Sequence, residues 1–296
     1  MTPRIAGFTY HRIDVGEVTL NVARGGVGPP VVLLHGFPQT HLAWRQVAAD
    51  LTQDHEVICP DLRGYGDSDK PTADPQGTAY AKRTMAADIV GLARRLGHQR
   101  FALAGHDRGG LVAFRAGLDH PDAVSHLAVL DVIPPAQMFA ALSGTAGIFA
   151  FHLYLLAYPP PLPERLVGAA PEVFFGHFLD AWTRQPGAIP AEIRAAYLAK
   201  TATPKAIAAV CADYRASAGV DSAHDEADRR AGRRLQMPVA ALWQDPGEVE
   251  LPFDPAAVWA GWAPDLRTAA LDCGHFLAEE RPGEVTAALR QLVDGA

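Results

Sequence analysis

The sequence contains little cysteine and no long hydrophobic run, and both absences narrow what the protein can be. No apolar stretch approaches the ~18 residues that a membrane span requires. The N-terminal stretch MTPRIAGFTYHRIDVGEVTL lacks the apolar core of a signal peptide. The three cysteines, Cys59, Cys211 and Cys273, are odd in number and match no metal-binding spacing. We therefore expect a soluble cytoplasmic protein with reduced thiols.

The chain also lacks any block of lysine and arginine. It has 26 Lys and Arg against 33 Asp and Glu, a formal net charge of −7. This balance argues against nucleic acid or an anionic membrane as the main partner. No Gly-rich phosphate loop, cofactor-type lysine or cluster of metal ligands is recognisable. The sequence therefore predicts no metal and no organic cofactor.

Short apolar runs that end in glycine or polar residues recur along the 296 residues, a pattern typical of buried parallel strands. The predicted strands cover 29–37, 56–64, 101–107, 126–133, 239–247 and 267–275. Helical patterns at 84–98 and 109–120 lie between them, and 8–26 has the pattern of an edge hairpin that turns near Gly16. The alternation predicts an α/β fold with a mostly parallel, doubly wound sheet.

The strand pattern stops between Pro134 and Met237, where most of the chain has helical periodicity. A helical insertion of this size is most simply a cap over the C-terminal edge of the sheet, where open α/β folds bind ligands. We predict a first core part at 1–134, a helical cap at 135–236 and a second core part at 237–296.

Polar residues follow the predicted strands at the points where a site would form. Gly105-His106-Asp107-Arg108-Gly109 has the outline of a nucleophile elbow, with Asp107 in the place where the motif usually carries serine. His275 follows a late strand, and either Asp131 or Asp245 follows another. Chance placement of the elbow, an HGFP loop at 35–38 and a late histidine in this order is improbable. These residues predict a nucleophile–histidine–acid triad.

The aspartate at the elbow indicates the reaction. A serine that attacked a saturated carbon would leave an ether, whereas a carboxylate leaves an ester that activated water can hydrolyse. Aspartate is also ionised at neutral pH and needs no base before it attacks. Asp107 thus predicts displacement of a halide or an epoxide oxygen, with His275 as the base for water. The backbone N–H groups of Phe37 and Arg108 are the expected oxyanion donors.

The chain resembles the Asp-nucleophile branch of the α/β-hydrolase superfamily, and most of all the fluoroacetate (haloacetate) dehalogenases. The similarity runs over nearly the whole length, in HGFPQTHLAWRQVA, DLRGYGDSDKP, GHDRGG, LAVLDVIP, PPPLPE, CADYRA and CGHFLAEE. It implies an eight-stranded α/β-hydrolase sheet flanked by helices, with a helical cap. It also implies a halogenated carboxylate as substrate, with conversion of a short 2-haloacid to the 2-hydroxy acid.

The resemblance implies further residue roles. The family's third triad member corresponds to Asp131, while Asp245 lies near the position that epoxide hydrolases and most relatives use. Arg108 corresponds to the arginine that binds the substrate carboxylate and also stands at a helix start, an electrostatically poor place for a cation without a function. His152 and Tyr214 match the cap residues that receive the leaving halide. Members are often dimeric, so a homodimer is one expectation.

Two positions depart from the family, and both lose a polar donor. Leu111 stands where a second carboxylate-binding arginine is found, and Leu153 stands where a tryptophan helps to hold fluoride. Each hydrogen bond to a charged group contributes ~1.5–3 kcal/mol, so we expect weakened specialisation for fluoride. The two leucines also make the expected pocket more apolar, with room for a longer 2-haloacid. Arg115 has a family counterpart and is interpreted as structural.

Two alternatives remain open. An epoxide hydrolase would use the same aspartate and histidine, with Tyr214 as one proton donor and Tyr154 or Tyr158 as the second. A non-catalytic ligand receptor would share the fold without the reaction, although such proteins commonly lose a catalytic group. Diol formation from an epoxide without halide release identifies the former, and tight binding without turnover the latter.

Overall fold

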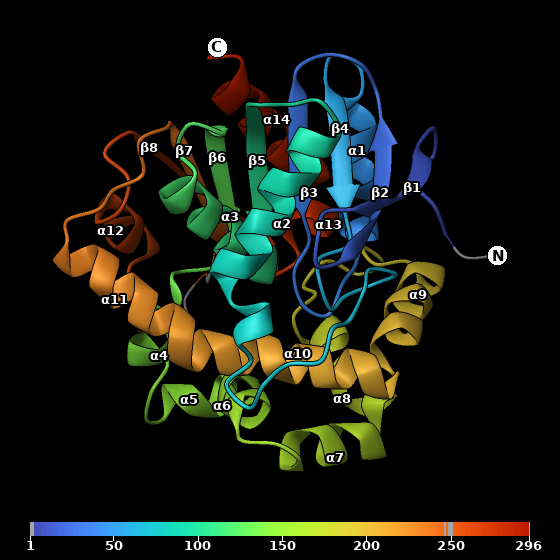
Figure 1. Cartoon of the computed structure of the whole chain (residues 1–296), viewed down its shortest axis with the longest axis vertical. Helices are drawn as coiled ribbons and strands as arrows, with labels where there is room; N and C mark the ends of the chain where they lie inside the picture. The colour runs from blue at the N-terminus through green and yellow to red at the C-terminus, as the bar shows by residue number, and fades with distance from the viewer. Residues whose placement is uncertain (1–2, 246, 248–250, 296) are drawn as a thin grey trace.

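A computed structural model of the chain describes residues 3–245, 247 and 251–295 (Figure 1). Within these residues eight strands form one sheet in the order β1-β2-β4-β3-β5-β6-β7-β8. The strands are β1 (Thr9–Asp14), β2 (Thr19–Gly25), β3 (Pro30–Leu34), β4 (Glu56–Pro60), β5 (Phe101–His106), β6 (Val124–Leu130), β7 (Val239–Gln244) and β8 (Leu266–Leu271). The pairs β1–β2 and β2–β4 are antiparallel and the others parallel. The predicted mostly parallel sheet of eight strands is confirmed.

Both faces of the sheet are covered by helices, because successive side chains of each strand point to opposite sides. In β3, Val32 and Leu34 belong to one hydrophobic cluster. That cluster includes residues of α2 (Lys82–Arg95) and α3 (Arg108–Asp119). Val31 and Leu33 belong to a second cluster, shared with α1 (Arg45–Leu51), α13 (Leu277–Glu280) and α14 (Pro282–Val293). The strands that carry the candidate site are therefore held rigidly between two layers.

Eight helices lie between β6 and β7 and gather at one end of the sheet in Figure 1. They are α4 (Pro135–Ala141), α5 (Ala146–Phe149), α6 (Phe151–Ala157), α7 (Leu162–Ala169), α8 (Pro171–Ala181), α9 (Ala191–Thr201), α10 (Pro204–Ala216) and α11 (Ser222–Arg230). A short π-helix at 217–221 joins the last two, and α12 (Pro255–Ala260) follows β7. We call the segment 135–236 the cap.

The strands end earlier than the sequence patterns predicted, and the shortening falls at the candidate site. β5 stops at His106 and β6 at Leu130, because Asp107 and Asp131 each have φ 49°, a left-handed conformation that no strand can continue. β7 stops at Gln244; of its predicted range 239–247, residue 246 lies outside the described part of the chain. No helix among the described residues is long and apolar enough to cross a membrane.

Candidate active site

Asp107 occupies a tight turn between β5 and α3, with φ 49° and ψ −117°. The glycines of the motif make this turn sterically feasible. A Cβ atom at Gly105 would lie 2.2 Å from the carbonyl oxygen of Gly109, and one at Gly36 would lie 2.5 Å from the Cβ of Asp107. The Phe37 N–H donates to Oδ1 of Asp107 at 2.7 Å. The turn therefore places Oδ1 of Asp107 against a backbone donor, and Oδ2 takes no part in this hydrogen bond.

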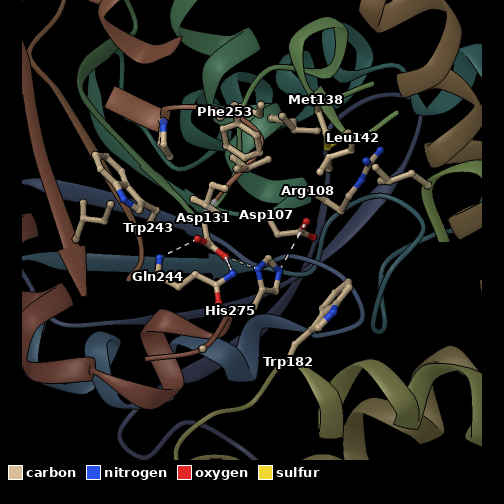
Figure 2. A pocket seen from close by; sticks show the side chains of 18 of the residues that line it. Asp107, Arg108, Asp131, Met138, Leu142, Trp182, Trp243, Gln244, Phe253 and His275 are labelled. Carbon is tan, nitrogen blue, oxygen red and sulfur yellow. Dashed lines mark hydrogen bonds and ion pairs between the residues drawn. The ribbon is translucent and has the colours of Figure 1, made fainter. Parts of the chain in front are cut away.

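The other oxygen of Asp107, Oδ2, lies 3.9 Å from Nε2 of His275 (Figure 2). On its opposite side, His275 Nδ1 lies 2.6 Å from Oδ2 of Asp131. Gln244 holds this carboxylate through its backbone N–H at 2.9 Å and its side-chain amide at 3.0 Å. The structure thus brings Asp107, His275 and Asp131 together in one line.

The rival acid Asp245 lies apart from this line. It is exposed, and its Oδ1 accepts the Gly247 N–H at 2.9 Å, an arrangement typical of a turn-capping carboxylate. The carboxylate on Nδ1 of His275 is that of Asp131.

The charges around His275 raise its pKa. Burial alone would lower the pKa, but the hydrogen bond and charge of Asp131, together with the charge of Asp107, outweigh it. His106 has the opposite balance, since burial lowers its pKa to about 4 and keeps it neutral. Its Nε2 lies 2.7 Å from the carbonyl oxygen of His275, to which it can donate. The neutral His106 can therefore hold the His275 backbone as a hydrogen-bond donor, while the pKa of His275 itself is raised.

Glu280 holds the backbone around His275, a role that our sequence analysis missed. Its Oε2 accepts the N–H groups of Gly274 at 3.0 Å, Arg184 at 2.9 Å and Gln185 at 2.8 Å. Its Oε1 accepts the Phe276 N–H at 3.3 Å. This single buried carboxylate therefore ties the loop of His275 to the cap segment that follows α8. The acidic pair at the end of CGHFLAEE was the available signal, but sequence alone cannot tell an exposed acid from a buried one.

A cavity of about 590 Å³ opens above Asp107 and His275 (Figure 2). His152 and Tyr214 line it from the cap, both buried. Burial lowers the pKa of His152 to about 3, and its Nδ1 has no partner among the described residues. Burial also raises the pKa of Tyr214 far above its usual value, so both groups are neutral. The Phe37 ring packs against both, at 6.2 and 5.5 Å between ring centroids.

The Arg108 guanidinium is already paired with a carboxylate. The side chain runs away from the Asp107 carboxylate (Figure 2), and Nε and Nη2 bind Asp213 at 3.0 and 2.8 Å. Nη2 also donates to Oγ of Ser217 at 2.6 Å. Lys82 contacts the same Asp213 carboxylate and lies 3.7 Å from a second one, Asp221, so two cations face two carboxylates in this cluster. Only Nη1 makes no hydrogen bond to a described residue. For the expected binding of a substrate carboxylate, Arg108 therefore has one nitrogen available, Nη1, and not the two that a bidentate contact needs.

The second expected oxyanion donor, the Arg108 backbone N–H, stays a prediction. The Arg108 backbone N–H, the first of α3, forms no hydrogen bond to Asp107 in the described structure, so only the Phe37 contact is in place.

Leu111 and Leu153 both line the cavity, buried to 1% and 4% exposure. The two tyrosines that could complete an epoxide site do not line it. Tyr154 is 43% exposed and donates to the carbonyl of Leu142, and Tyr158 is 55% exposed. Among the residues that the structure describes, Tyr214 is therefore the only tyrosine of the cavity wall.

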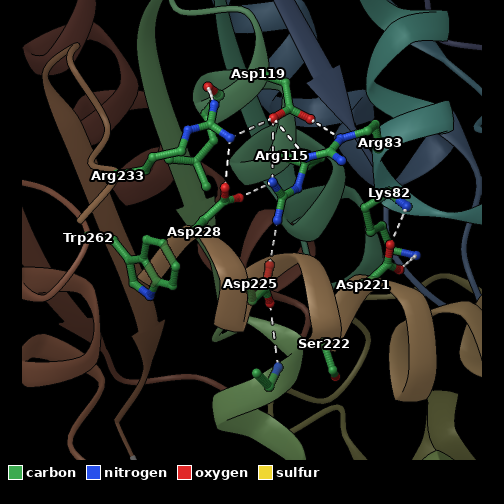
Figure 3. Close-up of polar contacts among 12 residues, drawn as sticks. Lys82, Arg83, Arg115, Asp119, Asp221, Ser222, Asp225, Asp228, Arg233 and Trp262 are labelled. Carbon is green, nitrogen blue, oxygen red and sulfur yellow. Dashed lines mark hydrogen bonds and ion pairs between the residues drawn. The ribbon is translucent and has the colours of Figure 1, made fainter. Parts of the chain in front are cut away.

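Arg115 lies away from the cavity, in a network that joins α3 to α11 (Figure 3). Its guanidinium binds Asp225 at 2.7 Å and Asp228 at 2.5 Å. This placement agrees with the structural interpretation of Arg115. The described residues contain no group of three or more His, Cys, Asp or Glu that could hold a metal ion.

The sequence profile of the α/β hydrolase fold matches residues 29–282. Fluoroacetate dehalogenase from Burkholderia sp. is 40% identical over 98% of this chain and 95% of its own length. The chain belongs to the α/β-hydrolase family. Soluble epoxide hydrolase from Corynebacterium sp. is 31% identical over 93% of both chains. The crystal structure of an α/β hydrolase from Nostoc sp. PCC 7120 superposes on it with a TM-score of 0.95, at 37% identity over 99% and 100% of the two chains.

The relatives of this α/β-hydrolase therefore include two kinds of enzyme, named for the opening of carbon–fluorine bonds and of epoxides. Family membership decides the fold and the broad class of chemistry, and the choice between the two reactions depends on the residues of the cavity.

Proposed function

We propose that this protein is a hydrolytic dehalogenase that converts a 2-halocarboxylate to the 2-hydroxy acid, with Asp107 as nucleophile. The observation that carries the proposal is that the two carboxylate oxygens of Asp107 have different surroundings. Oδ1 accepts the Phe37 N–H, while Oδ2 faces His275 across 3.9 Å beneath the cavity. Such a carboxylate is oriented to attack a carbon with one oxygen while the other stays in a donor site.

In the first step Oδ2 of Asp107 bonds to the carbon that bears the halogen, and the carbon–halogen bond breaks with its electron pair on the halide. Tyr214 and one ring nitrogen of His152 donate to the departing halide, as neutral groups whose protons stay in place. Nη1 of Arg108 contacts the substrate carboxylate. The product of this step is an ester between Asp107 and the organic acid.

In the second step His275 takes a proton from water, and the hydroxide adds to the ester carbon of Asp107. Asp131 holds the imidazolium that forms, through the contact at Nδ1. Negative charge then develops on Oδ1, where the Phe37 N–H already donates. Collapse expels the 2-hydroxy acid, whose oxygen receives the proton from His275, and Asp107 returns as a carboxylate when it releases the remaining proton.

The test is halide release from fluoroacetate, chloroacetate and 2-chloropropanoate, followed with a halide electrode. We expect release that depends on Asp107, with chloride leaving faster than fluoride because Leu111 and Leu153 supply no donor. Similar kcat/KM values for fluoroacetate and chloroacetate would contradict the loss of fluoride specialisation. No halide from any of the three would overturn the proposal.

The second candidate is an epoxide hydrolase, favoured by the 31% identical relative and by the Tyr214 hydroxyl in the cavity wall. An epoxide oxygen must receive a proton, whereas a halide leaves as a stable anion. A single cavity tyrosine beside a histidine with lowered pKa is poorly matched to that proton transfer. Diol formation from styrene oxide, with no halide release from the acids, would establish this alternative.

Glu280 gives a prediction about the second step. Glu280→Ala should lower kcat by about 10²-fold, because a displaced imidazole loses its alignment with water. Halide should still appear in a burst of one equivalent per site, since the first step does not need His275. Glu280→Gln keeps an acceptor for most of the four N–H groups and should restore much of kcat. Stopped-flow halide detection separates the burst from turnover.

Glu279→Ala is the matched control for this experiment. Glu279 lies on the same short helix and is as deeply buried, but it binds Arg45, Tyr197 and Gln39 rather than the loop of His275. The Glu279→Ala variant should have a lower melting temperature, without a selective loss of the second step. Equal kinetic effects from both alanine variants would contradict a positioning role for Glu280.

A further inference from the structure

The cavity is much larger than a haloacetate needs. Its volume of about 590 Å³ falls in the range of roughly 300–1,000 Å³ that is typical of pockets for drug-sized ligands. A two-carbon acid has only a handful of non-hydrogen atoms and would occupy the end that holds Asp107 and His275. Most of the volume would then hold only water against apolar walls.

The surplus volume has a defined location and chemistry. Met138 of α4, Leu142 directly after that helix and Phe253 of the segment after β7 lie together on the far side of Asp107 from Trp182 (Figure 2). Trp243 and Trp259 add two more aromatic walls. We call these five residues the apolar chamber. The Trp259 indole N–H donates to the Val132 carbonyl at 3.0 Å, so it is satisfied within the protein.

The charged side chains near the cavity offer a small anionic substrate little electrostatic binding. Both arginines of the described cavity wall already have carboxylate partners, Arg108 at 2.8 Å from Asp213 and Arg184 at 2.9 Å from Asp272. Asp107 and Asp131 add negative charge beside the reacting carbon. A substrate acid that bound by its carboxylate alone would meet few uncompensated donors, so binding must draw on apolar contact.

We propose that the preferred substrate carries a sizeable apolar group, a linear alkyl chain of several carbons or a phenyl ring, on the carbon that bears the halogen. This inference rests on the proposed dehalogenase function and names the substrate class of the same site. The apolar group enters the chamber, while the halogen faces Tyr214 and His152. Leu111 and Leu153 then belong to a continuous apolar wall and do not merely mark lost donors.

The test is a series of 2-bromoalkanoates from propanoate to octanoate, with 2-bromo-2-phenylacetate as the aromatic member. Every member has a secondary reacting carbon, so intrinsic reactivity stays nearly constant along the alkyl series. Each buried methylene should raise kcat/KM about fourfold until the chamber is full. Bromide release measures each value. The same measurement with the Asp107→Asn variant and the same substrate gives the background.

Leu142→Trp narrows the chamber without touching the catalytic residues. It should flatten the rise with chain length and leave kcat/KM for 2-bromopropanoate nearly unchanged. Leu162→Trp is the matched control, the same substitution at a cap position that is 47% exposed and outside the cavity wall. Melting temperatures of both variants check that each is folded.

The outcomes separate the two proposals. Bromide release that is flat or falls with chain length in the wild-type protein would overturn the chamber proposal and leave the dehalogenase function standing. A rise that Leu142→Trp and Leu162→Trp preserve equally would also overturn it, because the chain would bind elsewhere. No bromide from any member would overturn the dehalogenase function and this inference together.

Discussion

Replacing His275 with glutamine should stop the enzyme after a single turnover. Glutamine fills similar space but cannot accept a proton from water, and general-base catalysis typically contributes 10²–10⁴-fold. We therefore expect kcat to fall by about 10³-fold or more, while one equivalent of halide per site still appears. Intact-protein mass spectrometry should show a mass increase equal to the haloacid less its hydrogen halide, and peptide mapping should place this increase on a peptide that contains Asp107.

The wild-type protein, quenched under the same conditions, is the control for this experiment. It should carry little adduct, because His275 removes the ester as it forms. A His275→Gln protein that releases no halide at all would contradict the two-step order, since His275 would then be needed for the attack itself. An adduct on any residue other than Asp107 would contradict the assignment of the nucleophile.

Replacing Asp107 with asparagine should abolish both the burst and the turnover. An amide is a far weaker nucleophile than a carboxylate, and losing a nucleophile typically costs about 10⁴-fold or more. The substitution is nearly isosteric, so the Phe37 N–H contact can persist through the amide oxygen. Halide release under single-turnover and steady-state conditions measures both losses.

Two further readouts make the Asp107 experiment specific. In ¹⁸O-water, a single turnover of the wild-type protein should yield product with unlabelled oxygen from Asp107, and many turnovers should label the Asp107 carboxylate. The charge of Asp107 contributes to the raised pKa of His275, so Asp107→Asn should lower the pKa of that imidazole in an NMR titration. Labelled oxygen in the first product would mean that Asp107 activates water instead.

Much of the site could be predicted because it depends on local patterns. Asp107, Asp131 and His275 each follow a strand, and parallel strands deliver such residues to one edge of a sheet. The choice of Asp131 over Asp245 could be ranked from the motif. Only the structure places Asp131 at 2.6 Å from His275 while Asp245 closes its own turn.

The features that the sequence did not predict all involve distant partners. Arg108 and Asp213 are 105 residues apart, and nothing in either motif says that their side chains share a buried ion pair. Glu280 acts on backbone groups of the cap, which have no residue-type signal. The exposure of Tyr154 and Tyr158 depends on which way a cap helix turns, and the size of the cavity depends on how several elements pack.

The proximity of Asp107 to His275 also orders the reaction in time. Before attack, the negative carboxylate contributes to a raised pKa of the imidazole and so favours its protonated form. Alkylation turns that carboxylate into a neutral ester, and this support for the proton disappears. The imidazole becomes free to act as a base at the moment when an ester exists for water to attack. Formation of the first bond thus removes the charge of Asp107, and the loss of that charge prepares His275 to act as the base in the second step.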